Sequence, residues 1–358
     1  MTVVLRGGSE TDVALAASAL RRGEVVAFPT ETVYGLGADA TNNDAVAMVY
    51  KAKGRPADNP LIVHMASRDA LDEAGFAAMS APALLLAEKF WPGPLTLVLA
   101  LSTEHPTSRI SSLVTSGLNT VAVRVPKHPV ASALLAATGL PIAAPSANSS
   151  GKPSPTQALH VITDLGGKIH SVLDGGEVIF GIESTVLDTT TNPPTILRPG
   201  SVTQHEIEAC IGYGVLVANS SGKTDDLAVP KAPGMKYRHY APASPVKIVY
   251  GGHLAFLKEV STASVNGVSQ AVVGIFAWSD TCARLESSEY GPRVTTTSAG
   301  EYGQVDVLAQ RLYGALRWLD EVKKVSLILA QGVADEDGAG LGFAVMNRLR
   351  KAALDHDR

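Results

Sequence analysis

The chain has 358 residues, of which 46% are hydrophobic and 18% charged, and its formal net charge is −4. This length suggests about two domains with sizeable cores, and the lack of a basic excess argues against a general nucleic-acid-binding protein. Cys210 and Cys282 lie far apart, so they indicate neither a zinc motif nor a disulfide framework. Without a signal-peptide core or an apolar run of membrane-spanning length, the sequence predicts a cytoplasmic protein that does not enter membranes.

The first predicted elements form a strand–helix–strand unit. A helix is expected over residues 11–22, capped by Thr11 or Asp12, and a strand over 25–28. The run 28–38, FPTETVYGLGA, follows with hydroxyl residues and glycines, which leave hydroxyls and backbone N–H groups free at a sheet edge. Such a loop suits a small polar ligand.

A basic turn follows the next predicted helix, which spans residues 43–53. Lys51, Lys53 and Arg55 surround Gly54, directly before an apolar strand at 61–64. These cations need either a bound anion or open solvent. The alternative to an anion site is a solvated helix end, because Lys and Arg favour the last turn of a helix. The loop and the basic turn flank one strand–helix–strand unit, so they can meet at one cleft.

Several later strands are followed by polar residues. Arg124 lies near the end of one strand, Arg198 follows another, and the run PSANSSG at 145–151 follows a third. Hydroxyl, amide and N–H groups in such a run suit phosphate and ribose, although a Ser/Gly loop without function is the alternative. The pattern predicts helices at 81–90 and at 156–165, the latter opened by Pro155, a short helix capped by Thr203, and strands at 95–101, 120–125, 141–144, 172–176, 183–188 and 195–197.

The remainder of the chain is predicted to be a linker and a second domain. The first domain is expected to end at residue 217, and residues 218–244, rich in proline and glycine, are the linker. Its GKT is no P-loop, because Val217 stands where the first glycine is required. Beyond 245, strands at 246–250, 271–277 and 327–330 alternate with helices at 302–322 and 341–354, which predicts a small doubly wound sheet.

Together these stretches resemble the YrdC/Sua5 family, the threonylcarbamoyl-AMP synthases. Further agreement comes from FWPGPLTL, TVAVRVP, APSANSSGKPSPT and GIESTVLD, and the ending AVMNRLRKAA resembles that of the Sua5-type members. The resemblance implies an α/β fold in three parts. These are a YrdC-like twisted mixed sheet with a central cleft over 1–217, a linker or lid over 218–244, and a smaller Rossmann-like Sua5 domain over 245–358.

The resemblance also implies an enzyme, a nucleotidyltransferase that converts L-threonine, bicarbonate and ATP into threonylcarbamoyl-AMP, pyrophosphate and water. This is the first step of N6-threonylcarbamoyladenosine formation at position 37 of tRNAs that read codons starting with A. A separate threonylcarbamoyl transferase would accept the product, so no stable nucleic-acid binding is expected. Mg²⁺ is expected with the triphosphate, held chiefly by phosphates and water, and its protein ligands stay unknown.

Carried over position by position, the resemblance implies three overlapping sets of site residues. Arg124 suits a carboxylate because its guanidinium is a planar fork, and cations suit the charge at phosphorus. An unstable N-carboxy-threonine needs a closed, dry site but no covalent nucleophile. The catalytic set is Lys53, Arg55, Ser146 and Asn148; the threonine set is Thr32, His64, Arg124, Ala144 and Ser184; the ATP set is Arg55, Asn59, Thr120, Ser146, Ser154, Arg198 and Tyr237.

The linker segment 232–242, APGMKYRHYAP, has aromatic and basic residues that solvated spacers rarely contain. We expect residues 236–240 to form a lid over the first domain, with Tyr237 against the nucleotide; a plain spacer whose tyrosines pack on the neighbouring domain is the alternative.

Other functions stay open at this point. A double-stranded RNA-binding module could use the same basic cleft, and it would show salt-sensitive RNA affinity without ATP turnover. A carbamoyl-transfer domain of hydrogenase maturation is less compatible, because such proteins carry zinc-finger and acylphosphatase-like regions that this chain lacks. A purely regulatory role would require a decayed site, whereas the expected motifs are intact.

Overall fold

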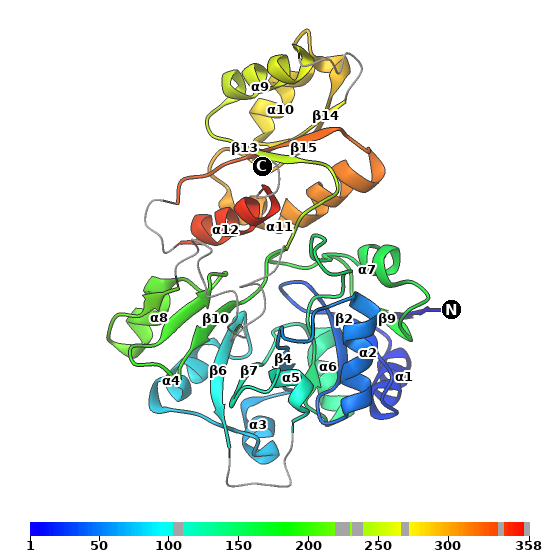
Figure 1. Cartoon of the computed structure of the whole chain (residues 1–358), viewed down its shortest axis with the longest axis vertical. Helices are drawn as coiled ribbons and strands as arrows, with labels where there is room; N and C mark the ends of the chain where they lie inside the picture. The colour runs from blue at the N-terminus through cyan, green and yellow to red at the C-terminus, as the bar shows by residue number, and fades with distance from the viewer. Residues whose placement is uncertain (103–109, 219–229, 231–238, 266–271, 336–339, 354–358) are drawn as a thin grey trace. The chain divides into compact units, whose positions relative to one another are not determined.

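The computed structural model describes residues 1–102, 110–218, 230, 239–265, 272–335 and 340–353 (Figure 1). The chain forms two compact units. The first contains residues 1–150 and 154–237, and the second contains 151–153 and 238–358. The predicted domain boundaries stay predictions, since most of the proposed linker, including Tyr237, lies outside the described residues. No helix in the described ranges combines the length and apolar character that a membrane crossing requires.

The first unit is built on a 12-stranded mixed sheet, as predicted. Its strand order is β1-β9-β2-β3-β8-β4-β7-β6-β10-β11-β12, with β5 paired to β6. The strands are β1 (Val3–Arg6), β2 (Val26–Pro29), β3 (Tyr34–Asp39), β4 (Ile62–His64), β5 (Ala77–Ala78), β6 (Leu95–Leu101), β7 (Thr120–Arg124), β8 (Ile142–Ala143), β9 (Ser171–Asp174), β10 (Thr185–Asp188), β11 (Thr195–Arg198) and β12 (Leu216–Val217).

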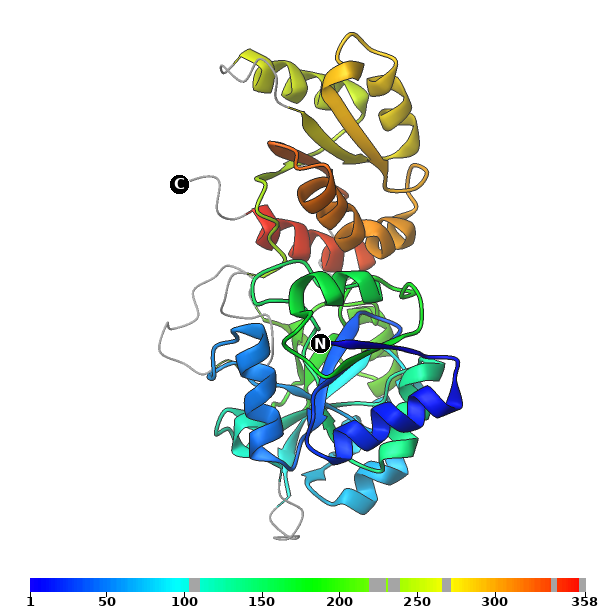
Figure 2. The same ribbon diagram turned by 90° about the vertical axis from the view of Figure 1, so that its right-hand side faces the viewer.

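Helices cover both faces of this sheet (Figures 1 and 2). One face packs the larger core against α2, α4, α7 and α8. The other carries α1 and α6 over β2, β8 and β9, and beside them a small cluster of Ile62, Val98, Ala122 and Val186. The helices are α1 (Glu10–Arg21), α2 (Asn43–Lys53), α3 (Arg68–Ala74), α4 (Ala81–Phe90), α5 (Ser112–Thr115), α6 (Pro129–Thr138), α7 (Ala158–Leu165) and α8 (Gln204–Ile211).

The predicted starts of three helices are wrong, and one of these helices begins at Val305 and not at residue 302. Helix α1 begins at Glu10 because the hydroxyl of Ser9 accepts from the N–H of Asp12, which makes Ser9 the cap. Helix α7 begins at Ala158 and not beside Pro155. Gln157 is extended, and the N–H of Thr156 donates to Nδ1 of His160 at 3.2 Å.

The stretch 28–38 is a hairpin, and only residues 30–33 form its loop. Strand β3 pairs antiparallel with β2, from Val26–Gly37 to Pro29–Tyr34. Gly37 permits this packing, because a Cβ there would lie 2.8 Å from the Phe28 ring. This glycine therefore serves a close approach inside the sheet, not a free loop edge.

The second unit is a Rossmann-like layer structure, as predicted. Its four strands are all parallel in the order β13-β16-β14-β15. Helices α9 and α10 lie on one face of the sheet, and α11 and α12 on the other (Figure 1). The elements are β13 (Val246–Val249), α9 (His253–Val265), β14 (Val273–Ala277), α10 (Ser279–Glu286), β15 (Val294–Ser298), α11 (Val305–Arg317), a π-helix (Trp318–Val322), β16 (Leu327–Gln331) and α12 (Leu341–Ala353).

The second unit also holds a short piece of chain from the loop that carries Ser146. Arg317 donates from Nε and Nη2 to the carbonyl oxygen of Pro153, at 3.1 and 2.6 Å. Lys152 pairs with Glu321 at 3.1 Å. Residues 151–153 therefore fold with the second unit, although the residues on either side belong to the first.

Candidate active site

Strand register places several predicted site residues on one face of the first sheet. His64 on β4 is paired with Arg124 on β7, and Arg198 on β11 with Val186 on β10. Ser184 lies two residues before Val186 and so shares its face, because side chains alternate along an extended strand. This is the face of the small apolar cluster, away from the larger core.

Arg124 is held by three protein oxygens. Its Nη1 donates to Oγ1 of Thr32 at 2.8 Å, and its Nε donates to the carbonyl of Gly93 at 3.2 Å. Its Nη2 lies 2.7 Å from Oε1 of Glu31, with both side chains almost fully buried. The predicted carboxylate-binding arginine is thus oriented by a carboxylate of the protein itself.

His64 is buried beside this group and is neutral. Burial, and secondarily the charge of Arg124, lowers its pKa to about 3. Its ring meets Phe28 edge-on, with centroids 6.1 Å apart. Its Nδ1 has no hydrogen-bond partner among the described residues. A neutral imidazole with one uncommitted nitrogen can bind a ligand hydroxyl.

Lys53 connects the basic turn to the loop after β8. Its Nζ donates to the carbonyl oxygens of Ser146 and Asn148, both at 2.5 Å, and its own carbonyl accepts from the N–H of Ser150 at 2.9 Å. The structure therefore brings Lys53 of the Lys-x-Arg pair against both residues of the Ser-x-Asn pair. Lys53 is 4% exposed, which excludes a solvated helix end for this residue.

Arg55 closes the basic turn on itself. Its Nε and Nη2 donate to the carbonyls of Asn59 and Pro60, at 3.1 and 2.9 Å. The side chain of Asn59 is buried, and its Oδ1 has no hydrogen-bond partner within the described ranges. Lys51, by contrast, is exposed and lines a surface pocket with Glu24 and His170.

A third group surrounds Ser184. Arg198 donates to its carbonyl and its hydroxyl, at 3.1 and 3.2 Å, and Thr96 shares a hydrogen bond with that hydroxyl at 2.8 Å. Next to it, Ser154 donates to Glu183 at 2.6 Å. This group adjoins Arg124 through the chain, since Gly93 accepts from Arg124 and the following Pro94 accepts from the N–H of Thr185.

Two predicted residues lie at the margins of these groups. Ala144 is buried and donates its N–H to the carbonyl of Ile62, at 2.8 Å. Thr120 begins β7 and shares a face with Arg124, but it lies four residues away, about 13 Å along an extended strand.

The comparisons with known proteins bear on both units. Residues 18–200 match the Sua5/YciO/YrdC family model, described as telomere recombination, and residues 202–354 match the model described as threonylcarbamoyl-AMP synthase, C-terminal domain. The chain belongs to the Sua5/YciO/YrdC family.

Members of the Sua5/YciO/YrdC family resemble this chain over nearly its whole length. The threonylcarbamoyl-AMP synthase of Bacillus subtilis is 46% identical over 346 residues, which cover 96% of this chain and 94% of that protein. The synthase of Pyrococcus abyssi is 44% identical over 353 residues, with the same coverage. A crystal structure of P. abyssi Sua5 complexed with L-threonine has a TM-score of 0.84 and 44% identity, covering 99% of this chain and 97% of that one.

Sequence reasoning missed three residues that contact the candidate site residues of this Sua5 family member. Each of these residues, Glu31, Thr96 and Glu183, lies inside a motif used for the resemblance. Their partners, however, are at least 29 residues away in the chain. A signal existed for Glu31, because an acidic residue amid buried β-branched neighbours needs a cationic partner. In the described part of the chain, no group of three or more His, Cys, Asp or Glu could hold a metal.

Proposed function

We propose that this protein is a threonylcarbamoyl-AMP synthase, a nucleotidyltransferase that acts on L-threonine, bicarbonate and ATP. The observation that carries the proposal is the buried group of Glu31, Thr32 and Arg124 beside a neutral His64. It occurs in a chain that is 44% identical, over 99% of its length, to a protein crystallised with L-threonine. The product would serve the first step of N6-threonylcarbamoyladenosine formation on tRNA.

The threonine pocket would consist of Thr32, His64, Arg124, Ala144 and Ser184. Arg124 suits the substrate carboxylate, and its pairing with Glu31 fixes the guanidinium in advance. Oε1 of Glu31 is engaged in the ion pair with Arg124, whereas Oε2 has no hydrogen-bond partner among the described residues. We therefore add Glu31 to the pocket, as the acceptor for the substrate amine.

The nucleotide would bind next to the junction of the basic turn and the loop after β8. Lys53 and Arg55 place positive charge there, and Ser146 and Asn148 add neutral polar groups. Arg198 is anchored on Ser184, a residue of the proposed threonine pocket, and would add positive charge for the triphosphate. Asn59, Thr120, Ser154 and Tyr237 complete the proposed nucleotide set.

The chemistry then requires positioning more than covalent catalysis. The threonine nitrogen forms a bond to the carbon of bicarbonate, and water leaves, which gives N-carboxy-threonine. An oxygen of this carbamate attacks the α-phosphorus of ATP, the bond to the β-phosphate breaks, and pyrophosphate departs. Burial of Glu31, Arg124 and His64 limits water near the carbamate, which otherwise loses carbon dioxide.

A divalent cation such as Mg²⁺ would enter with the triphosphate and offset its negative charge. The described part of the chain has no cluster of acidic or imidazole ligands to compete for it. Threonylcarbamoyl-AMP would pass to a transferase that acts on tRNA, with no stable nucleic-acid complex of this protein.

The test is direct. The purified protein, incubated with labelled bicarbonate, L-threonine, ATP and Mg²⁺, should form labelled threonylcarbamoyl-AMP and one pyrophosphate per product. Salt-sensitive binding of double-stranded RNA, without pyrophosphate release, would instead identify a binding module.

A further inference from the structure

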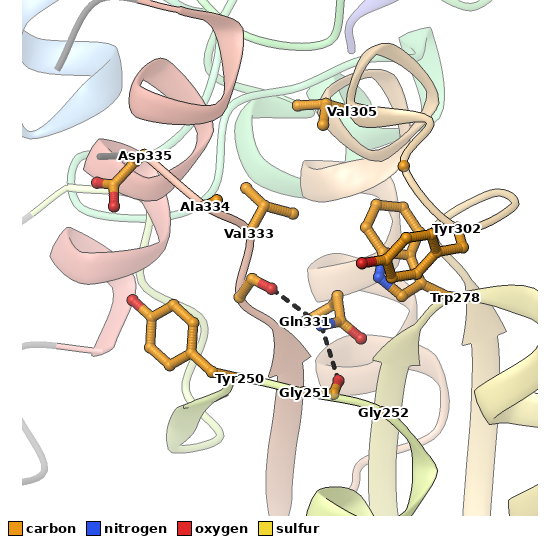
Figure 3. A pocket seen from close by; sticks show the side chains of 12 residues that line it. Tyr250, Gly251, Gly252, Trp278, Tyr302, Val305, Gln331, Val333, Ala334 and Asp335 are labelled. Carbon is orange, nitrogen blue, oxygen red and sulfur yellow. Dashed lines mark hydrogen bonds between the residues drawn. The ribbon is translucent and has the colours of Figure 1, made fainter. Parts of the chain in front are cut away.

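The second unit contains a pocket of about 550 Å³ that the proposed reaction does not use (Figure 3). It lies beyond the carboxyl ends of β13, β14 and β16, where the chain leaves the sheet toward α9, α10 and α12. In open parallel α/β sheets, ligands bind at this edge. The volume falls in the range of small-molecule sites.

Gln331, which lines this pocket, carries a buried acceptor that has no donor within the described ranges. Gln331, at the end of β16, is 2% exposed. Its Nε2 donates to the carbonyls of Gly251 and Gly332, at 3.2 and 2.9 Å, so the orientation of its amide is fixed. Its Oε1 has no hydrogen-bond partner among the described residues. A ligand N–H would satisfy this oxygen, and buried acceptors are normally satisfied.

Aromatic rings stand on two sides of this acceptor. Figure 3 shows Tyr250 on one side of Gln331, and Trp278 with Tyr302 on the other. The rings of Trp278 and Tyr302 are 6.0 Å apart between centroids, and Tyr302 is 86% exposed. An exposed tyrosine against a buried tryptophan offers a wall for a flat ring.

The charge and the glycine content of the pocket lining restrict the class of ligand further. Asp335 is the charged residue of the lining, and it is already paired with Arg350 at 2.6 Å. The described lining has no lysine or arginine, which disfavours a polyphosphate. Gly252 leaves room beside the chain, since a Cβ built there has no heavy atom within 4 Å.

We propose that this pocket binds an uncharged, planar nitrogen heterocycle of nucleoside size, with an N–H donor directed at Oε1 of Gln331. The ring lies against Trp278 and Tyr302, and the glycines allow it to approach the strand ends. This site is separate in its residues from the proposed catalytic groups, and the inference does not depend on the reaction that those groups perform.

Adenosine is the probe, and calorimetric titration of the full chain is the measurement. Gly252→Leu should fill the pocket and weaken adenosine binding at least tenfold. Gly8→Leu is the matched control, because Gly8 is equally open and lies outside the pocket, and it should bind like the parent. Purine riboside, which lacks the exocyclic amino group, should bind at least tenfold more weakly than adenosine.

Gly252→Leu and its control Gly8→Leu separate this pocket from the proposed ATP site. Adenosine binding that survives Gly252→Leu would assign the ligand to another site and overturn the proposal. No saturable binding of adenosine, or equal binding of purine riboside, would overturn it as well. Loss of binding in Gly252→Leu with retained binding in Gly8→Leu supports it.

Discussion

Glu31 and Arg124 form an ion pair with 2.7 Å between Oε1 and Nη2, and their side chains are 2% and 4% exposed. The two residues come from separate parts of the sheet, one from the loop between β2 and β3 and the other from the end of β7. Removing one partner of a buried pair leaves the other charge without compensation. This pair therefore links stability to the proposed recognition of L-threonine.

Glu31→Gln should lower the free energy of unfolding by about 3–5 kcal/mol, because Arg124 stays buried without its counter-charge. Urea denaturation measures this loss. The same variant should raise the KM for L-threonine more than that for ATP. Glu88→Gln, at an exposed position of α4, is the control and should change neither quantity. A Glu31→Gln protein with parental stability would contradict the buried pairing.

Lys53→Met and Lys51→Met compare a buried and an exposed cation two residues apart on α2. Lys53→Met should reduce the rate of pyrophosphate release at least about tenfold. It should also lower stability by about 1–3 kcal/mol, because the carbonyls of Ser146 and Asn148 lose a donor. Lys51→Met should leave both the rate and the melting temperature near the parental values. Equal losses of rate and stability in the two variants would contradict a special role for the buried Lys53.

L-Threonine should be preferred over L-serine and L-valine. A pocket that accepts the hydroxyl at His64 or Ser184 and packs the methyl group excludes each analogue on a different ground. Pyrophosphate release at saturating ATP, measured with each amino acid, checks this preference. Comparable kcat/KM values for all three would remove Thr32, His64 and Ser184 from a threonine pocket.

Stability should fall in mild acid because of His64. Its pKa is lowered from 6.5 to about 3 in the folded protein, mainly by burial and further by Arg124. Between these values the unfolded chain takes up a proton that the folded chain does not. The free energy of unfolding therefore decreases as the pH falls from about 6.5 towards about 3. Above pH 6.5, His64 is neutral in both states and this loss of stability is absent.

His64→Gln tests this linkage through urea denaturation at about pH 7.5 and about pH 5. The parent should lose more stability than the variant over this interval, so the difference between them should shrink in acid. His128, whose pKa burial also lowers, is present in both proteins and does not affect the comparison. Equal losses of stability in the parent and the variant between these two pH values would show that the pKa of His64 is not lowered by folding.

Local signals allowed much of the fold to be predicted. Gly54 ends α2 in the left-handed conformation, with φ of 63°, and Thr203 caps α8 in a reciprocal capping box with Glu206. Both depend on residues within one helical turn. The start of α7 was not predicted correctly. The N–H of Thr156 donates to the side chain of His160, and the helix begins at Ala158 and not beside Pro155.

Sequence reasoning named candidate site residues, but it did not give their arrangement. Lys53 with Ser146, and His64 with Arg124, were expected to share a site from their motifs. The identity of their neighbours depends on strand order, which local patterns do not encode. Glu31 shows this limit, because only the hairpin of β2 and β3 directs its carboxylate to a residue at the end of β7.

The contact of Arg317 with the carbonyl of Pro153 has a consequence for synthesis on the ribosome. The chain passes between the two units at 150/151, 153/154 and 237/238. Chains begin to fold from the N-terminus as they emerge, so Lys53 can reach Ser146 and Asn148 early. Pro153 receives its hydrogen bonds only after residue 317 has emerged. The segment 151–153 therefore acquires its final hydrogen bonds late, after the strands of the first unit have emerged.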